Sequence, residues 1–185
     1  MCKLRDVVTW TKPTELRYGG ATAILNKMNG DAPMLEEGDK APAFTLPTED
    51  GEVSLKDYKG QTLVLYFYPK DDTSGCTKQA IGFSEQLAEF EAAGAKVLGV
   101  SKDSPAKHAK FREKHELTVD LASDEECTMI EAYGSWVEKS MYGRKYMGID
   151  RSTFLIDGKG KVQKIWRKVR VPKHVETVLA AVKEL

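Results

Sequence analysis

One cysteine stands at a position where the sequence predicts chemistry. In the run YFYPKDDTSGCTKQAIGF, residues 66–83, Cys76 follows an apolar strand pattern and a charged turn, and it begins a segment with a helical pattern. The first turn of a helix offers unpaired backbone N–H groups and the positive end of the helix dipole, which favour a nucleophilic thiolate. Free cysteine is also among the most buried residue types, so this position alone fits a structural thiol equally well.

Two further residues of the same turn and one distant arginine could assist a thiolate. Pro69, Thr73 and Cys76 stand in the spacing PxxxTxxC, and Arg151 follows the tripeptide GID before a later strand pattern. Taken singly, a proline at a strand end stops the strand, a threonine before a helix caps it, and an arginine at a strand edge pairs with a carboxylate in solvent. The structural interpretation is therefore favoured for each of them alone.

Strand and helix patterns alternate from Met34 to the C-terminus. We expect strands at 62–68, 95–101, 119–122, 152–157 and 161–167, and helices at 75–93, 105–114, 123–133 and 171–185. Gly94 suits the left-handed position that closes the first helix, Ser104 and Pro105 suit the start of the second, and SDEE at 123–126 forms a capping box. The alternation predicts an α/β fold in which helices flank a central sheet.

The first 33 residues show a different pattern. Residues 1–33 alternate polar, apolar and glycine-containing pieces without a sustained period, which predicts a loosely structured N-terminal extension. A transit peptide is disfavoured because the segment contains Asp6 and Glu15 and no serine. The stretch MLEEGDKAPAFTL, which begins at Met34, has the composition of a domain start, so we expect one domain over residues 34–185.

Composition excludes several functional classes. The 185 residues carry 28 Lys and Arg and 28 Asp and Glu, so no broad positive field is available for nucleic acid or an anionic membrane. The three cysteines, Cys2, Cys76 and Cys127, are odd in number and widely spaced, which indicates a reducing compartment and no zinc site. No run approaches the roughly 18 apolar residues of a membrane helix, and the start lacks the apolar core of a secretory signal. A cytoplasmic protein is expected.

The run YFYPKDDTSGCTKQA as a whole resembles the active-site segment of the peroxiredoxins, and it is most similar to the bacterioferritin-comigratory, or Q-type, subfamily. The segment GDKAPAFTLPTEDGEVSLKDYKGQ resembles the opening hairpin of that family. The segment GIDRSTFLIDGKGKV, residues 148–162, resembles its later strand with the active-site arginine. The resemblance covers nearly the whole chain from Met34, and it implies a thioredoxin-like fold with a central mixed β-sheet flanked by helices.

The resemblance also implies an activity and the residues that perform it. It implies a thiol-dependent peroxidase that reduces hydrogen peroxide and organic hydroperoxides through a sulfenic acid on Cys76, with no cofactor and no metal. By the same resemblance Thr73 and Arg151 hold the peroxide oxygens, Pro69 shields the sulfur, and Gln79 is a supporting polar residue. The reductant would be thioredoxin, glutaredoxin or a small thiol, and the protein would be a monomer or a weak homodimer.

The sequence departs from the Q-type pattern at two positions. Ser74 stands where proline is common, and Ile81 stands where many members have a resolving cysteine, so a local disulfide between positions 76 and 81 cannot form. The absence of a cysteine at position 81 predicts a 1-Cys-like cycle. Cys127 is a possible resolving residue, but the acidic residues at 124–126 oppose its thiolate, and a structural thiol is favoured.

The remaining titratable residues have ordinary interpretations. His108, His115 and His174 are scattered, and solvated surface positions are favoured over metal binding. Asp71 and Asp72 are adjacent in a turn, so their side chains diverge, and we expect local hydrogen bonds rather than acid–base or metal chemistry.

A second functional class stays open at this point. The chain could be a redox-inactive thioredoxin-like module that binds peptides or acts as a chaperone, with an inert Cys76. The joint occurrence of Pro69, Thr73, Cys76 and Arg151 in the family's order favours the peroxidase. Trapping of a sulfenic acid after one equivalent of peroxide separates the two hypotheses.

Overall fold

The computed structural model describes residues 34–141 and 143–185. The expected N-terminal extension, residues 1–33, lies outside the described residues. Among those described, no helix is long and apolar enough to cross a membrane.

The centre of the fold is a mixed sheet of five strands. In spatial order these are β5 (Asp120–Ser123), β4 (Ala95–Ser101), β3 (Thr62–Phe67), β8 (Ser152–Ile156) and β9 (Val162–Trp166). Strand β4 is parallel to β3 and β5, whereas β8 is antiparallel to both β3 and β9. The predicted α/β fold with a mixed sheet is confirmed, and each of the five strands falls within one residue of its predicted range.

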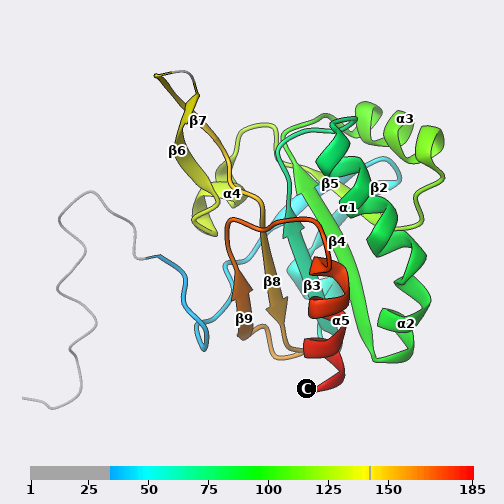
Figure 1. Ribbon diagram of the computed structural model, residues 1–185. Helices are drawn as coiled ribbons and strands as arrows, with labels where there is room; N and C mark the ends of the chain where they lie inside the picture. The colour runs from blue at the N-terminus through cyan, green and yellow to red at the C-terminus, as the bar shows by residue number, and fades with distance from the viewer. Residues whose placement is uncertain (1–33, 142) are drawn as a thin grey trace, which may run out of the picture. The chain divides into compact units, whose positions relative to one another are not determined.

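Both faces of the sheet are buried. Because side chains alternate along a strand, β3 directs Val64 and Tyr66 to one face and Leu65 and Phe67 to the other. The helix-side core contains Tyr66 and Phe83, with α1 (Ser74–Glu85), α2 (Leu87–Ala92), α3 (Pro105–His115) and α5 (His174–Lys183). The hairpin-side core contains Phe67 with α4 (Thr128–Ala132) and β1 (Thr45–Thr48). Figure 1 shows α1, α2 and α5 in front of the sheet.

Two predicted helices differ from the structure. The helix expected over 75–93 is divided into α1 and α2 at Gln86, whose φ of −102° and ψ of 6° leave the helical region. The capping box expected at 123–126 does not open a helix. The Asp124 carboxylate instead accepts a hydrogen bond from the Ile130 N–H at 2.8 Å, and α4 begins only after Cys127, whose φ of 61° is left-handed.

Two hairpins form two-stranded sheets separate from the central one. The predicted opening hairpin is present as β1 and β2 (Gly51–Ser54), followed by the short 3₁₀ helix η1 (Leu55–Tyr58). A second hairpin, β6 (Trp136–Met141) and β7 (Arg144–Ile149), was not predicted, and it projects from the body of the fold in Figure 1. Its residues 144–147 are all exposed, so they carry no alternation of apolar and polar side chains that sequence analysis could detect.

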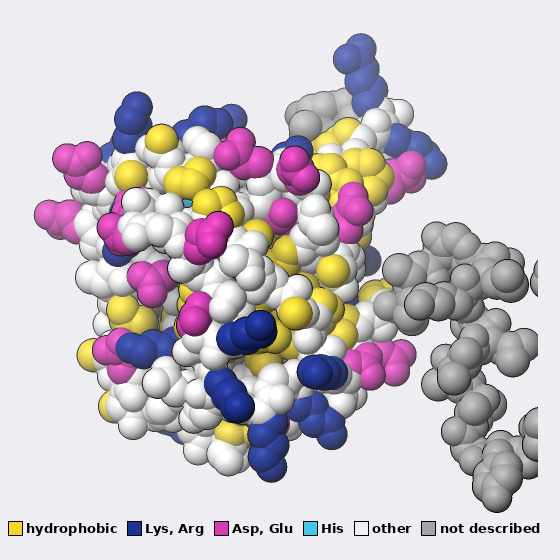
Figure 2. Space-filling model, turned by 180° about the vertical axis from the view of Figure 1, so that it is seen from behind, with side chains coloured by type: hydrophobic (Ala, Val, Ile, Leu, Met, Phe, Trp, Pro, Cys, Tyr) yellow, Lys and Arg dark blue, Asp and Glu magenta, His cyan; other side chains and the backbone are white. Residues whose placement is uncertain are grey.

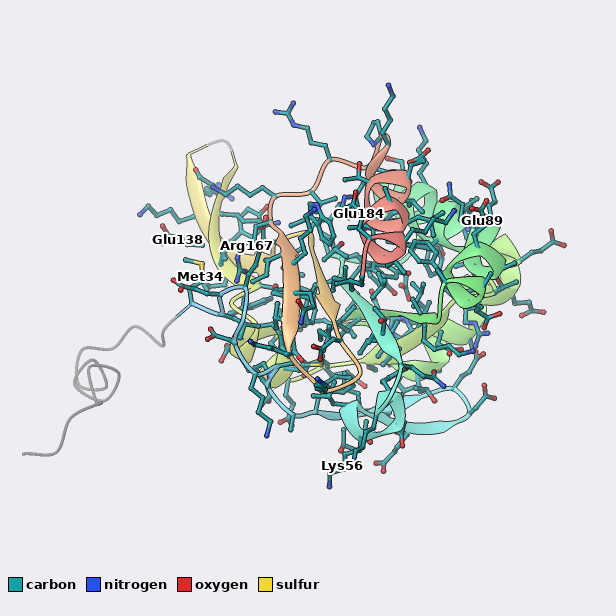
Figure 3. All side chains as sticks on the ribbon, turned by 90° about the horizontal axis from the view of Figure 1, so that it is seen from below. Met34, Lys56, Glu89, Glu138, Arg167 and Glu184 are labelled. Carbon is teal, nitrogen blue, oxygen red and sulfur yellow. The ribbon has the colours of Figure 1, made fainter. Side chains whose placement is uncertain are left out.

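Hydrogen bonds connect the start of the described chain to Arg167, the residue after β9. The Arg167 guanidinium donates hydrogen bonds to the carbonyl oxygens of Leu35, Tyr133 and Gly134, at 3.0 to 3.2 Å. Figure 3 shows the labelled Met34 and Arg167 side chains next to each other. On the face in Figure 2, basic and acidic side chains are interspersed, with a group of basic side chains toward the lower edge.

Candidate active site

Cys76 is the third residue of α1, directly after the turn that leaves β3. Thr73 is the N-cap residue with extended backbone angles, and its carbonyl accepts the first hydrogen bond of the helix from the Thr77 N–H at 2.9 Å. The Cys76 side chain is 2% exposed and belongs to the helix-side core. Its thiol therefore lies in the first helical turn, at the positive end of the α1 dipole.

Arg151 brings a positive charge to this thiol from a distant part of the sequence. It precedes β8, and the pairing of Phe67 with Ser152 places it beside the end of β3. The Arg151 Nη2 donates a hydrogen bond to the Cys76 Sγ at 3.2 Å. The sulfur therefore has a guanidinium group within hydrogen-bond distance in addition to the first turn of α1.

Gln79 holds the other side of the guanidinium. It follows Cys76 by three residues on the same face of α1 and is fully buried, and its Oε1 accepts a hydrogen bond from Arg151 Nη1. The Gln79 Nε2 has no partner among the described residues. A Cβ atom at Gly75 would lie 3.3 Å from Arg151 Nη2, so glycine leaves the space in which the guanidinium packs against the helix.

Thr73 and Pro69 flank the site from the exposed turn. The Thr73 hydroxyl donates a hydrogen bond to the Lys70 carbonyl at 3.2 Å and does not cap α1. Pro69 is exposed at the start of the turn. The structure therefore joins Cys76, Gln79 and Arg151 by direct contacts, with Thr73 and Pro69 in the adjoining turn.

Cys127 lies on the other side of the sheet from Cys76. It is 3% exposed in the hairpin-side core, whereas Cys76 belongs to the helix-side core. Burial raises the pKa of the Cys127 thiol, the Lys102 charge opposes this effect, and the Asp124 charge adds to it. Ile81 is partly buried and packs against the helix-side core, as an apolar helix residue should.

The prediction that His108 and His174 are surface residues is wrong. His108 is 0% exposed, and its Nδ1 lies 2.8 Å from the Asp71 carboxylate. His174 is 7% exposed, and its Nε2 lies 2.8 Å from the Thr153 hydroxyl. Burial, and secondarily the nearby Arg151 charge, lower the pKa of His174 to about 4, so it is neutral at pH 7.

The prediction of purely local bonding for Asp71 is also incomplete, because its partner His108 is 37 positions away. Its neighbour Asp72 is at the surface, where its carboxylate pairs with Lys114 and His115, each at 2.8 Å. No group of three or more His, Cys, Asp or Glu side chains within residues 34–141 and 143–185 is placed to hold a metal ion.

The comparisons with known proteins agree on one family. Residues 37–165 match the AhpC/TSA family. The chain is 51% identical over 146 residues to a putative peroxiredoxin bcp of Coxiella burnetii, which covers 78% of this chain and 97% of the relative. It is 48% identical over 152 residues to the peroxiredoxin Bcp of Bacillus subtilis, with coverages of 82% and 97%. The chain belongs to the AhpC/TSA family.

A solved structure supports the same assignment. Peroxiredoxin Q of Xanthomonas campestris superposes with a TM-score of 0.73 at 44% identity, covering 76% of this chain and 90% of that one. The resemblance to the bacterioferritin-comigratory subfamily and the thioredoxin-like fold are thereby confirmed. This peroxiredoxin is a thiol-dependent peroxidase, with a hydroperoxide as substrate and a thiol as reductant, and not an inert binding module.

Proposed function

We propose that this peroxiredoxin reduces hydroperoxides by nucleophilic attack of the Cys76 thiolate. The observation that carries the proposal is the 3.2 Å hydrogen bond from Arg151 Nη2 to the Cys76 Sγ in the first turn of α1. A solved relative that is 43% identical, the bacterioferritin comigratory protein of Xanthomonas campestris, is described by its alkyl peroxide reduction activity. Hydrogen peroxide and small organic hydroperoxides are the corresponding substrates here.

The chemical step transfers one oxygen atom to sulfur. The thiolate attacks the terminal oxygen of the hydroperoxide, the S–O bond forms as the O–O bond breaks, and the products are the Cys76 sulfenic acid and an alkoxide or hydroxide that takes up a proton from water. Negative charge moves from sulfur to the leaving oxygen in the transition state. A fixed cation beside that path stabilises the transition state, since it needs no reorganisation when the charge moves.

Each neighbouring residue has a role in this step. Arg151 supplies the charge, and Gln79 fixes the guanidinium through the terminal nitrogen that does not contact the sulfur. The Thr73 hydroxyl and the first N–H groups of α1 hold the peroxide oxygens. Pro69 shields the thiolate from water at the start of the turn. No metal or cofactor takes part in the step.

The cycle closes with an external thiol. Ile81 has no sulfur, and the five-stranded sheet separates Cys76 from Cys127, whereas a disulfide requires Cα atoms within about 7 Å. We therefore assign Cys127 a structural role and propose a 1-Cys-like cycle with thioredoxin, glutaredoxin or a small thiol as reductant. The net charge of zero fits a protein without nucleic-acid or membrane partners. The three widely spaced cysteines fit a cytoplasmic location, and the resemblance to the Q-type subfamily fits a monomer or weak homodimer.

A trapping experiment tests the proposed function. After one equivalent of hydrogen peroxide, a sulfenic-acid reagent analysed by mass spectrometry should label Cys76, and Cys76→Ser should show neither label nor turnover. Cys127→Ser should retain most turnover with a small thiol or glutaredoxin. A stoichiometric disulfide between Cys76 and Cys127 in the unmodified chain would instead make Cys127 the resolving residue, and full turnover by Cys76→Ser would refute the mechanism.

A further inference from the structure

A buried polar cluster lies at the base of the turn that carries the active site. The Asp71 carboxylate accepts a hydrogen bond from the Tyr68 hydroxyl at 2.7 Å through one oxygen. Its other oxygen lies 2.8 Å from His108 Nδ1, and because a carboxylate only accepts, this nitrogen carries the proton. The three side chains are 7%, 1% and 0% exposed for Asp71, Tyr68 and His108. We call them the turn cluster.

The backbone of the same turn is fixed at a second point. The Asp71 N–H donates a hydrogen bond to the Asp103 carboxylate at 2.9 Å, and Asp103 accepts another from the Ser101 hydroxyl at 3.1 Å. Asp103 is 6% exposed and follows β4. The turn is therefore attached through the Asp71 backbone to the end of β4, and through the Asp71 side chain to His108 on α3.

Burying the polar side chains of the turn cluster between the active-site turn and α3 has a cost in free energy. A buried carboxylate and imidazole lose their hydration, and apolar side chains of similar volume commonly stabilise a core as well or better. Burial raises the pKa of Tyr68 far above its ordinary value, and the Asp71 charge adds to this effect, so the Tyr68 hydroxyl stays a donor. The turn also contains Asp72 at a φ of 58°, in the left-handed region that aspartate adopts more readily than most residues.

We propose that the turn cluster positions the catalytic turn for reaction with peroxide. This inference rests on the proposed function of Cys76. The cluster holds residue 71, two positions before Thr73 and five before Cys76, so it sets where the Thr73 hydroxyl and the start of α1 lie relative to the sulfur. Tyr68, Asp71 and His108 act through the turn and are positioning residues. The directional bonds fix the turn more narrowly than apolar packing would, and peroxide, a small substrate, depends on that alignment.

A paired set of variants separates positioning from stability. His108→Leu leaves a buried carboxylate without its partner, so both the melting temperature and the peroxide rate should fall. The double variant Asp71→Ala with His108→Leu removes the unpaired charge, and its melting temperature should recover toward that of the wild type. Its second-order rate with hydrogen peroxide should stay lower by about tenfold, since the turn is no longer aligned.

The rate of Cys76 alkylation by iodoacetamide measures the reactivity of the thiol without requiring that peroxide be aligned with it. In the double variant the contact of Arg151 with Cys76 is retained, so the alkylation rate should stay within about twofold of the wild type. If the peroxide rate recovers together with the melting temperature, the turn cluster is structural only. If Cys76→Ser retains full turnover, the proposed function has failed rather than this inference.

The surface pair beside the cluster gives a matched control. Asp72 also links the turn to α3, through Lys114 and His115, but its side chain is 47% exposed. Asp72→Asn keeps a residue that tolerates a left-handed backbone, and exposed ion pairs contribute little, so the peroxide rate should stay within about twofold of the wild type. A loss as large as that of the double variant would show that the surface contacts to α3 matter as much as the buried ones, which overturns the assignment to the buried cluster.

Discussion

The guanidinium of Arg151 has two hydrogen-bond partners with different functions. One N–H group contacts the Cys76 Sγ, and the other contacts the Gln79 Oε1. Gln79 is neutral, so it orients the guanidinium without cancelling its charge, which remains available to the thiolate and to the leaving oxygen. At the residue scale, the proposed mechanism therefore makes reactivity depend on how closely the Arg151 guanidinium lies to the Cys76 sulfur.

Gly75→Ala tests that dependence. The added Cβ would lie 3.3 Å from Arg151 Nη2, so the guanidinium must shift by a few tenths of an ångström. Alanine is favoured over glycine in helices by up to about 1 kcal/mol, so the free energy of unfolding should not fall. The second-order rate with peroxide should fall about threefold to tenfold. Gly82→Ala in the same helix, whose Cβ would meet Val175 at 3.2 Å, is the control and should leave that rate unchanged.

Ile81→Cys should restore a local resolving cysteine. Five residues of helix span about 7.5 Å along the axis, which exceeds the Cα separation of a disulfide, so the bond can form only after the first turn of α1 unwinds. We expect peroxide to produce a disulfide between positions 76 and 81, observed by mass spectrometry, and a shift of preference toward thioredoxin. A variant that stays in the sulfenic acid form would show that α1 does not open at Cys76.

At the scale of elements, His174 connects α5 to β8 and β9. This histidine bonds the Thr153 hydroxyl and packs edge-on against Trp166. It belongs to the first turn of α5, and it is buried in its neutral form. The contact between α5 and the sheet thus depends on a neutral imidazole, and protonation of His174 in the folded chain costs free energy.

This coupling predicts a pH dependence of stability. The His174 pKa is about 4 in the folded chain and about 6.5 in the unfolded chain, so between these values only the unfolded chain binds the proton. The free energy of unfolding should therefore fall as the pH is lowered from 6.5 to 4, by about 1 to 3 kcal/mol from this residue. Urea titrations of His174→Gln should show a shallower pH slope. Equal pH slopes for the wild type and His174→Gln would contradict a contribution of His174 to the pH dependence of stability.

At the scale of the whole molecule, much of the fold could be predicted from the sequence. Strands β3 and β4 are continuous apolar runs because both faces of the sheet are buried, and such runs are recognisable. The sequence position of Cys76, taken alone, fits a reactive thiol and a structural thiol equally well. The resemblance to a family singled out Arg151, and the pairing of β3 with β8 brings it to the sulfur.

The rest could not be predicted because it depends on distant partners. The environments of His108 and His174 are made by residues 37 and 21 positions away, and no local pattern distinguishes them from surface histidines. The β6–β7 hairpin was missed because its residues 144–147 are exposed. The turn cluster is therefore visible only in the folded structure.

We also propose that residues 34–185 form the complete catalytic domain. The first described residues are already bonded to it, since the Leu35 carbonyl accepts from Arg167, and the Glu37 carboxylate accepts from the Ile165 N–H at 3.0 Å. A protein that begins at Met34 should keep its melting temperature and its peroxide rate, measured by calorimetry and stopped-flow. Loss of cooperative melting or of the rate would assign the first 33 residues a role in the domain.

The second-order rate constant of Arg151→Met with hydrogen peroxide tests the central claim most directly. Methionine keeps much of the side-chain volume and removes the charge beside the Cys76 Sγ, so the rate should fall about a hundredfold or more while the cooperative melting is retained. The control is Arg170→Met, the same change at an exposed position, which should leave the rate unchanged. A rate for Arg151→Met equal to that of the wild type would contradict the account and leave Arg151 a structural residue.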